Sequence, residues 1–134
     1  MSTILVNTLT GTSTAGSITV TGEGNSTTTN LQQGLAKAWY NYNQSTDSEA
    51  DTFNISTIND DSAGKHSGNF SNNFNNATYS QPSETDAYRS RYETSGSGSP
   101  NRTTSTSQVI LTYNSSGNLT DFYQTNTSMH GDLA

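Results

Sequence analysis

The sequence predicts a mainly β protein, built as a small antiparallel β-sandwich with an N-terminal β arm and one short helix. Ser, Thr and Asn are abundant, and Thr suits a pleated surface while Asn and Ser suit the turns between strands. Several short segments alternate apolar and polar residues, which is the period of a strand with one solvated face. The net charge is only -6, too small to indicate a charged, disordered chain.

The chain is short of apolar material for its length. Ile, Leu, Val and Phe together number 19 of 134 residues. Ordering a backbone costs about 1–2 kcal/mol per residue, and so few apolar side chains offset that cost poorly within one subunit. We therefore expect subunit contacts to supply the deficit, in a homotrimer. The alternative is a marginal monomer with mobile ends.

We predict three segments along the chain. The first is an N-terminal β arm over 1–24, expected to attach to other proteins, with strand-like runs at 3–9 and 17–21. A short helical neck follows over 25–38. A β-sandwich head then covers 39–134.

The neck carries a narrow apolar stripe. Leu31, Leu35, Ala38 and Trp39 follow helical spacing after a run of N-cap candidates. Such a stripe packs either under the chain's own sheet or around a symmetry axis with two further copies. These four residues are our candidates for the oligomer interface, and Trp39 is expected to be buried in the core or in that interface.

From Trp39 onward the period of the pattern changes to two, which indicates a strand. Tyr40 and Tyr42 fall on one face of this strand, and Trp39, Asn41 and Asn43 fall on the other. Further strands are predicted, with Asn- and Gly-containing turns between some of them, at 52–58, 67–74, 108–113 and 119–125.

The stretch 80–107 is predicted to be a long exposed loop around a short strand. It holds both prolines and many serines, so its backbone is expected to be solvated. Tyr88 and Tyr92 fall on one face of the short strand, and Arg89 and Arg91 on the other. We name these four residues as candidates for contact with a partner, either a host-surface glycan or a protein. The alternative is a plain edge strand with solvated arginines.

No pattern indicates catalysis, a cofactor site or a metal site. The chain has no cysteine, and His66 and His130 lack the spacing of metal-ligand motifs. Asp47, Glu49 and Asp51 alternate, but nothing indicates a deep groove between two carboxylates of the kind that glycoside hydrolysis needs. We therefore predict a non-enzymatic protein. A polysaccharide-cleaving spike is the enzymatic alternative.

Charge and hydropathy argue against nucleic-acid binding and against membrane insertion. With five Lys and Arg residues and a pI near 4.5, the chain is not expected to bind nucleic acid. The apolar run near the first residue spans only 4–6, too short for a signal peptide or membrane anchor. We expect no membrane insertion, and assembly in the cytoplasm.

Four segments carry a resemblance to a known family, and they lie at 1–9, 30–39, 51–60 and 131–134. In the second, Asn-Leu-Gln-Gln-Gly-Leu-Ala-Lys-Ala-Trp leads directly into the predicted strand. Through these segments the chain resembles small tail-fibre-like virion structural proteins of marine bacteriophages, of the cyanophage and pelagiphage type. The resemblance implies an appendage subunit of the virion, assembled in the host cytoplasm and bound to other virion proteins through its arm. By analogy with fibres it also implies a trimer. The alternative is a head decoration or cement protein, such as a capsid fibre or knob.

Overall fold

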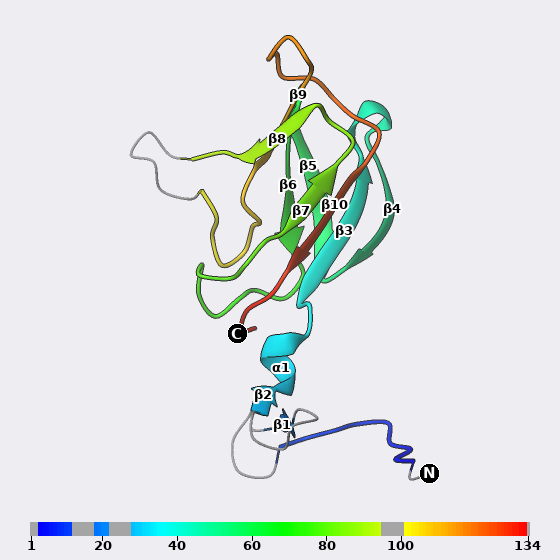
Figure 1. The fold of residues 1–134 in the computed structure, drawn as a ribbon, viewed down its shortest axis with the longest axis vertical. Helices are drawn as coiled ribbons and strands as arrows, with labels where there is room; N and C mark the ends of the chain where they lie inside the picture. The colour runs from blue at the N-terminus through cyan, green and yellow to red at the C-terminus, as the bar shows by residue number, and fades with distance from the viewer. Residues whose placement is uncertain (1–2, 12–17, 22–27, 95–100, 134) are drawn as a thin grey trace. The chain divides into compact units, whose positions relative to one another are not determined.

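We describe a computed structural model of the chain, which defines residues 3–11, 18–21, 28–94 and 101–133. The protein is all-β, with antiparallel sheets, as predicted (Figure 1). It divides into two compact units, Met1–Leu35 and Ala36–Ala134. The elements, in chain order, are β1 (Thr19–Thr21), β2 (Thr28–Asn30), α1 (Leu31–Gly34), β3 (Ala38–Asn43), the 3-10 turn η1 (Gln44–Thr46), β4 (Ser48–Phe53), β5 (Ile55–Ser62), β6 (Lys65–Phe70), β7 (Ser83–Thr85), β8 (Arg89–Tyr92), β9 (Ile110–Tyr113) and β10 (Thr125–Met129).

The first unit holds a small hairpin and one turn of helix. Strands β1 and β2 pair antiparallel, and α1 follows β2 without a break. The hairpin is tied to the helix by a hydrogen bond from the Leu31 amide to the Ile18 carbonyl, 2.8 Å long. The strand predicted at 3–9 is absent, since those residues lie outside any strand, and the helix is shorter than the predicted neck. The helix ends at Gly34, before the last residues of the predicted helical stripe, and strand β3 begins at Ala38.

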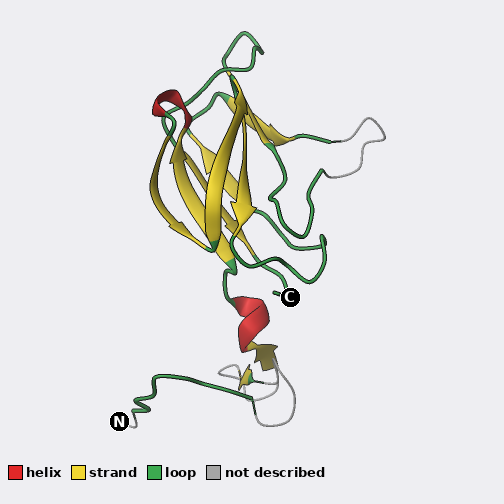
Figure 2. Cartoon of the chain, turned by 180° about the vertical axis from the view of Figure 1, so that it is seen from behind, coloured by secondary structure: helices red, strands yellow, loops and turns green. Residues whose placement is uncertain are grey.

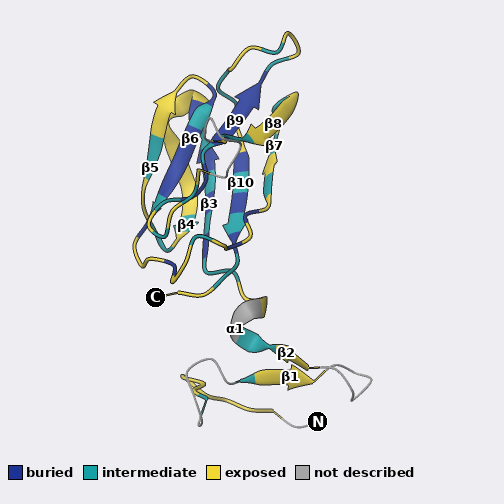
Figure 3. Cartoon of the chain, turned by 90° about the vertical axis from the view of Figure 1, so that its left-hand side faces the viewer, coloured by how far each residue is buried: buried dark blue, intermediate teal, exposed yellow. Residues whose placement is uncertain are grey.

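The second unit is a sandwich of two four-stranded sheets (Figure 2). We call the sheet with strand order β4-β3-β10-β7 the first sheet, and the sheet with order β5-β6-β9-β8 the second sheet. Neighbouring strands in each sheet run antiparallel. Buried residues concentrate on the strands that face the other sheet, above all on β6, β9 and β10 (Figure 3).

Strand β3 shows how the sequence pattern produces the core. Its residues alternate between buried and half-buried, with Tyr40 and Tyr42 inward and Asn41 outward, as the period of two predicts. The rings of Tyr40 and Tyr42 pack against His66 from the second sheet, with centroids 6.2 and 5.2 Å away. The apolar core between the sheets comprises Ala38, Tyr40, Tyr42, Phe70, Phe74, Tyr79, Ile110 and Met129.

The core also contains polar side chains, which form hydrogen bonds with one another and with backbone groups. The buried Gln81 side chain donates to the Gln108 carbonyl at 3.1 Å and accepts from the Gln108 amide at 2.9 Å. Gln108 in turn donates from its side chain to the Glu93 carbonyl. Buried polar groups are tolerated when they are paired in this way. Thr112, Thr125 and Thr127 are buried as well, in strands β9 and β10.

A single residue carries the chain from one sheet to the other. The predicted strand at 52–58 is in fact two strands, β4 and β5, separated by Asn54 with a φ of 57°. Asn tolerates this left-handed conformation because its short side chain bonds nearby backbone. The Asn54 amide group donates to the carbonyls of Lys37 and Asn72, both at 3.0 Å, and its oxygen accepts from the Asn72 amide at 2.7 Å.

Two further predictions about the head need correction. The short strand expected within 80–107 is β8, but the same stretch also holds β7, and both are edge strands of the two sheets. Its serines and threonines find hydrogen-bond partners in the sandwich, as Ser83 does with Thr127 at 2.6 Å between their hydroxyl oxygens. Residues 95–100 of that stretch lie outside the described part of the chain. The strand predicted at 119–125 begins only at Thr125 and forms β10.

Candidate functional site

A shallow groove of about 560 Å³ lies on the outer face of the first sheet. It crosses β3, β10 and β7, and we call it the Trp39 groove after its largest side chain. Trp39 is half-buried and pairs across strands with Ser128 on one side and with Phe53 on the other. Residues directly opposite in an antiparallel pair share one face, so Phe53, whose exposure is 50%, extends the aromatic surface beside the groove.

A polar row runs beside these aromatic side chains. Strand register aligns Asp51, Asn41, Asn126 and Glu84 across β4, β3, β10 and β7 in turn. Asn41 donates from its side-chain nitrogen to the side-chain oxygen of Asn126. Each amide thereby keeps hydrogen-bonding capacity for another molecule, an acceptor on Asn41 and a donor on Asn126. The row thus offers donors and acceptors in a fixed line on a rigid sheet.

The groove is weakly acidic. Glu84 is the charged residue among those that line it, and Asp51 lies at the far end of the same row on β4. Adjacent strands are about 4.8 Å apart, so three strand steps separate these two carboxylates by about 14 Å at the backbone. Paired glycosidase carboxylates lie about 5–9.5 Å apart. The arrangement therefore favours binding of a ligand over cleavage of a glycosidic bond.

Trp39 was expected in the core or in an oligomer interface; it is half-buried outside the core of its own subunit, and the interface stays a prediction. Alternation along β3 turns Ala38 and Tyr40 inward, which leaves the indole on the outer face. Removing a half-buried ring loses only part of the free energy that full burial of that ring would contribute to folding. We predict that Trp39→Ala lowers the free energy of unfolding by about 1–2 kcal/mol, against the 3–5 kcal/mol typical of a fully buried ring. Urea denaturation measures this, and a larger loss, equal to that of the inner-face control Tyr40→Ala, contradicts the assignment.

The other residues proposed for an oligomer interface lie in different environments. Ala38 is completely buried in the core of its own subunit, so its apolar character is explained without a second copy. Leu31 is half-buried and Leu35 is exposed to 53%. The helical stripe therefore does not exist as predicted, because α1 ends before Leu35 and Trp39 belongs to β3. Leu35 keeps the exposure that an interface residue needs.

The four residues proposed for partner contact do not form one strip. Tyr88 lies before β8 and is exposed to 73%, whereas Tyr92 is half-buried and packs against the core. The Tyr92 hydroxyl donates to the Gln81 carbonyl, which fixes the ring in place. Arg89 and Arg91 lie over the Tyr113 ring, with guanidinium carbons 5.1 and 5.2 Å from its centroid. These cation–π contacts cover Tyr113 on the second sheet.

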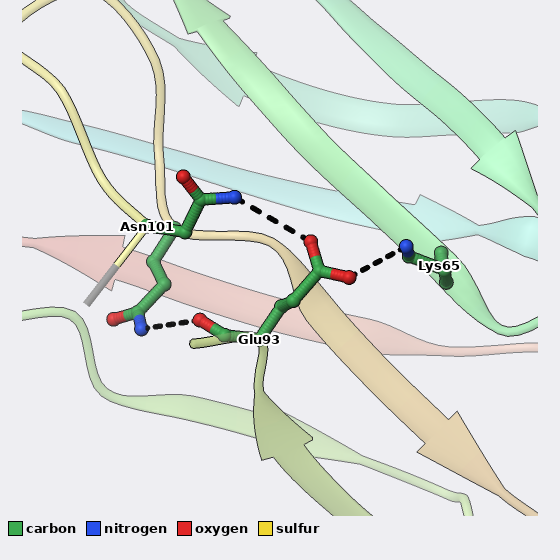
Figure 4. Close-up of polar contacts among 4 residues, drawn as sticks. Lys65, Glu93 and Asn101 are labelled. Atoms are coloured by element: carbon green, nitrogen blue, oxygen red, sulfur yellow. Dashed lines mark hydrogen bonds and ion pairs between the residues drawn. The ribbon is translucent and has the colours of Figure 1, made fainter. Parts of the chain in front are cut away.

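A third basic residue stands beside these arginines on the second sheet. Lys65 forms an ion pair with Glu93 at 2.6 Å, and the Asn101 side chain lies 3.5 Å from the other carboxylate oxygen (Figure 4). The hydrogen bond from Lys65 lowers the pKa of the Glu93 carboxyl, and the same bond raises the pKa of Lys65. Both side chains keep about 30% of their surface exposed, so the pair contributes little to stability. It ties the end of β8 to β6.

Among the described residues, those considered for catalysis or metal binding lie in different environments. Asp47, Glu49 and Asp51 are exposed, and Asp47 accepts a hydrogen bond from the Tyr42 hydroxyl at 2.8 Å. Burial raises the pKa of that phenol, so Tyr42 stays protonated and serves as a donor. His66 is completely buried. Among the residues that the structure describes, no three His, Asp or Glu side chains are arranged to hold a metal ion.

Comparison with known proteins does not indicate a function for this site. No protein-family model, curated protein or solved structure matches the chain. Within the described ranges, no helix has both the length and the apolar character that crossing a bilayer requires. Sequence reasoning missed Glu84 and Asn126 as site residues, because only the pairing of β7 and β10 places them beside Asn41. No local signal in the sequence marks that pairing.

Proposed function

We propose that this protein is a non-enzymatic structural subunit of a bacteriophage particle, of the tail-fibre-like or appendage kind. In this proposal residues 1–35 attach it to other virion proteins, the sandwich is its head, and it works as a homotrimer. The resemblance of four segments to marine phage virion proteins supports this proposal. The alternative of a head decoration protein places the same subunit on the capsid, and labelling the protein on purified particles separates the two locations.

One observation carries the attachment role: the first unit leaves its large apolar side chains exposed. Ile4, Leu5, Val6 and Leu9 expose 60–90% of their surface, and Val20 exposes 51%. The head, in contrast, keeps most of its large apolar residues buried or half-buried. Exposed apolar side chains in sequence are typical of a segment that packs on another protein. Such a segment both joins the subunit to a particle and supplies the burial that its own core lacks.

Substitutions in this apolar run test the proposal. We predict that the triple variant Ile4→Ser, Leu5→Ser and Val6→Ser reduces the amount of this protein in purified particles by about ten-fold or more, since each lost side chain removes roughly 1.5–3 kcal/mol of burial at the contact. Quantitative mass spectrometry of particles, with the variant supplied in trans, measures the loss. The melting temperature of the head is expected to stay unchanged.

The matched control removes an exposed apolar group from the head instead. Tyr123→Ser is suitable because Tyr123 is exposed to 71% and lies outside the Trp39 groove. It is expected to leave incorporation at the wild-type level. Equal incorporation of the triple variant and the wild type contradicts attachment through the first unit.

A further inference from the structure

We propose that the Trp39 groove binds a neutral carbohydrate, with a sugar ring stacked on Trp39 and its hydroxyls held by Asn41, Asn126 and Glu84. This inference goes beyond the attachment role, because it assigns a ligand to the head and does not involve residues 1–35. The groove lies entirely within the second unit, on elements β3, β7 and β10.

The backbone of the two central strands in the groove is already hydrogen-bonded on both sides, so a ligand there contacts side chains. Strand β3 lies between β4 and β10, and β10 lies between β3 and β7, so both have a paired strand on each side. An added peptide strand needs unpaired backbone groups at a sheet edge. Strand β7 is an edge strand, but the floor of the groove on β3 and β10 presents only outward side chains, so a ligand lying there is bound by those side chains.

The side chains of the groove match the two surfaces of a sugar ring. Pyranose C–H groups form an apolar face, and they pack favourably on the electron-rich face of an indole. The sugar hydroxyls point outward from the ring edge, each able to donate and to accept. Beside Trp39, the Asn41 and Asn126 amides are already locked to each other, so both are held in position before a ligand arrives. Glu84 is exposed at the end of the row, where its carboxylate accepts from hydroxyls.

Charge and size narrow the ligand further. The groove lining holds no Lys or Arg, and its one charged residue is Glu84. A phosphate, sulfate or uronic acid would be repelled by that carboxylate, which favours a neutral ligand over anionic glycans and nucleic acid. The volume of about 560 Å³ lies within the range of about 300–1,000 Å³ found for ligand sites. The geometry thus points to uncharged hexose units.

Trp39 is the chain's only tryptophan, so its fluorescence reports directly on the groove. The test titrates the purified full-length protein with neutral linear hexasaccharides of glucose, mannose, galactose and N-acetylglucosamine, and with hexagalacturonate as the anionic arm. We expect a saturable change in emission with at least one neutral saccharide, with half-saturation at or below about 1 mM. No change with hexagalacturonate is expected.

Substitutions inside and outside the groove show whether the saccharide binds there. Isothermal titration with the responsive saccharide should show affinity reduced about ten-fold or more for Trp39→Ala, and reduced by a smaller factor for Glu84→Gln, whose exposed position on an edge strand does not endanger folding. Tyr88→Ala and Tyr123→Ala remove exposed aromatic rings elsewhere on the head and should bind as the wild type does.

Several results overturn the inference. One is the absence of any saturable response to the four neutral saccharides. Another is tighter binding of hexagalacturonate, and a third is an emission change that depends on protein concentration alone, which identifies a second copy as the occupant. Equal loss of affinity in Trp39→Ala and Tyr123→Ala also overturns it. This assay uses purified protein, so its failure leaves the particle-incorporation result of the triple variant unaffected.

Discussion

Gly64→Ala is expected to destabilise the head by about 3–5 kcal/mol, combining a left-handed backbone penalty with overpacking. Gly64 lies in the two-residue turn between β5 and β6 with a φ of 69°. A Cβ at this position would stand 2.5 Å from the Thr120 nitrogen and 2.7 Å from the Thr112 oxygen, both backbone atoms that cannot swing aside. The same glycine donates to Asp121 and accepts from Thr112, so a shifted turn also loses these bonds.

Gly117→Ala is the matched control for this substitution. Gly117 has a φ of 81°, but a Cβ there would meet only the end of the Arg89 side chain, at 3.0 Å. It therefore incurs the backbone penalty alone, about 1–2 kcal/mol. Urea denaturation of both variants separates the two contributions. A loss at Gly64 no larger than the loss at Gly117 contradicts the close packing of the β5–β6 turn against 112 and 119–120.

The second large effect is a loss of stability on acidification, caused by His66. Its ring is completely buried beside Tyr40 and Tyr42, and neither ring nitrogen has a hydrogen-bond partner among the described residues. Burial lowers the pKa of His66 from 6.5 to about 4, against a smaller opposing effect of Asp121. Between these two pH values the unfolded chain binds a proton that the folded chain does not, so stability falls as the pH falls through this range. The loss amounts to about 3 kcal/mol by pH 4.

His66→Leu isolates this contribution, because it keeps an apolar side chain of similar size and removes the titration. We expect the free energy of unfolding of the wild type to drop by about 3 kcal/mol more than that of His66→Leu between pH 7 and pH 4. Parallel curves for the wild type and His66→Leu would show that His66 is solvated in the folded protein.

Patterns local to one strand could be predicted from the sequence. The alternation from Trp39 to Asn43 correctly placed Tyr40 and Tyr42 on the opposite face from Asn41, because strand geometry alone decides it. The all-β class followed in the same way from composition and short alternating runs. The helical stripe from Leu31 to Trp39 was wrong, since helical spacing was extended across a boundary where the chain had already become a strand.

Features that depend on distant pairing could not be predicted. Strand β10 has no apolar alternation to reveal it, because its inward residues include Thr125 and Thr127. Strand β7 is short, polar and stabilised by β10 alone within its sheet. The Trp39 groove joins Asn41 and Asn126, which are 85 positions apart along the chain, with Glu84, which lies between them in sequence. Only the completed first sheet brings them together.

The mass of the purified wild-type protein in solution tests the central claim most directly, which is that this chain works as an assembled subunit and not alone. One subunit has a mass of 14.3 kDa. Sedimentation equilibrium at micromolar concentration should give a species of about three times that mass, because so few apolar side chains offset the cost of ordering the chain poorly within one subunit. A clean monomer that unfolds cooperatively at the same concentration would contradict the account.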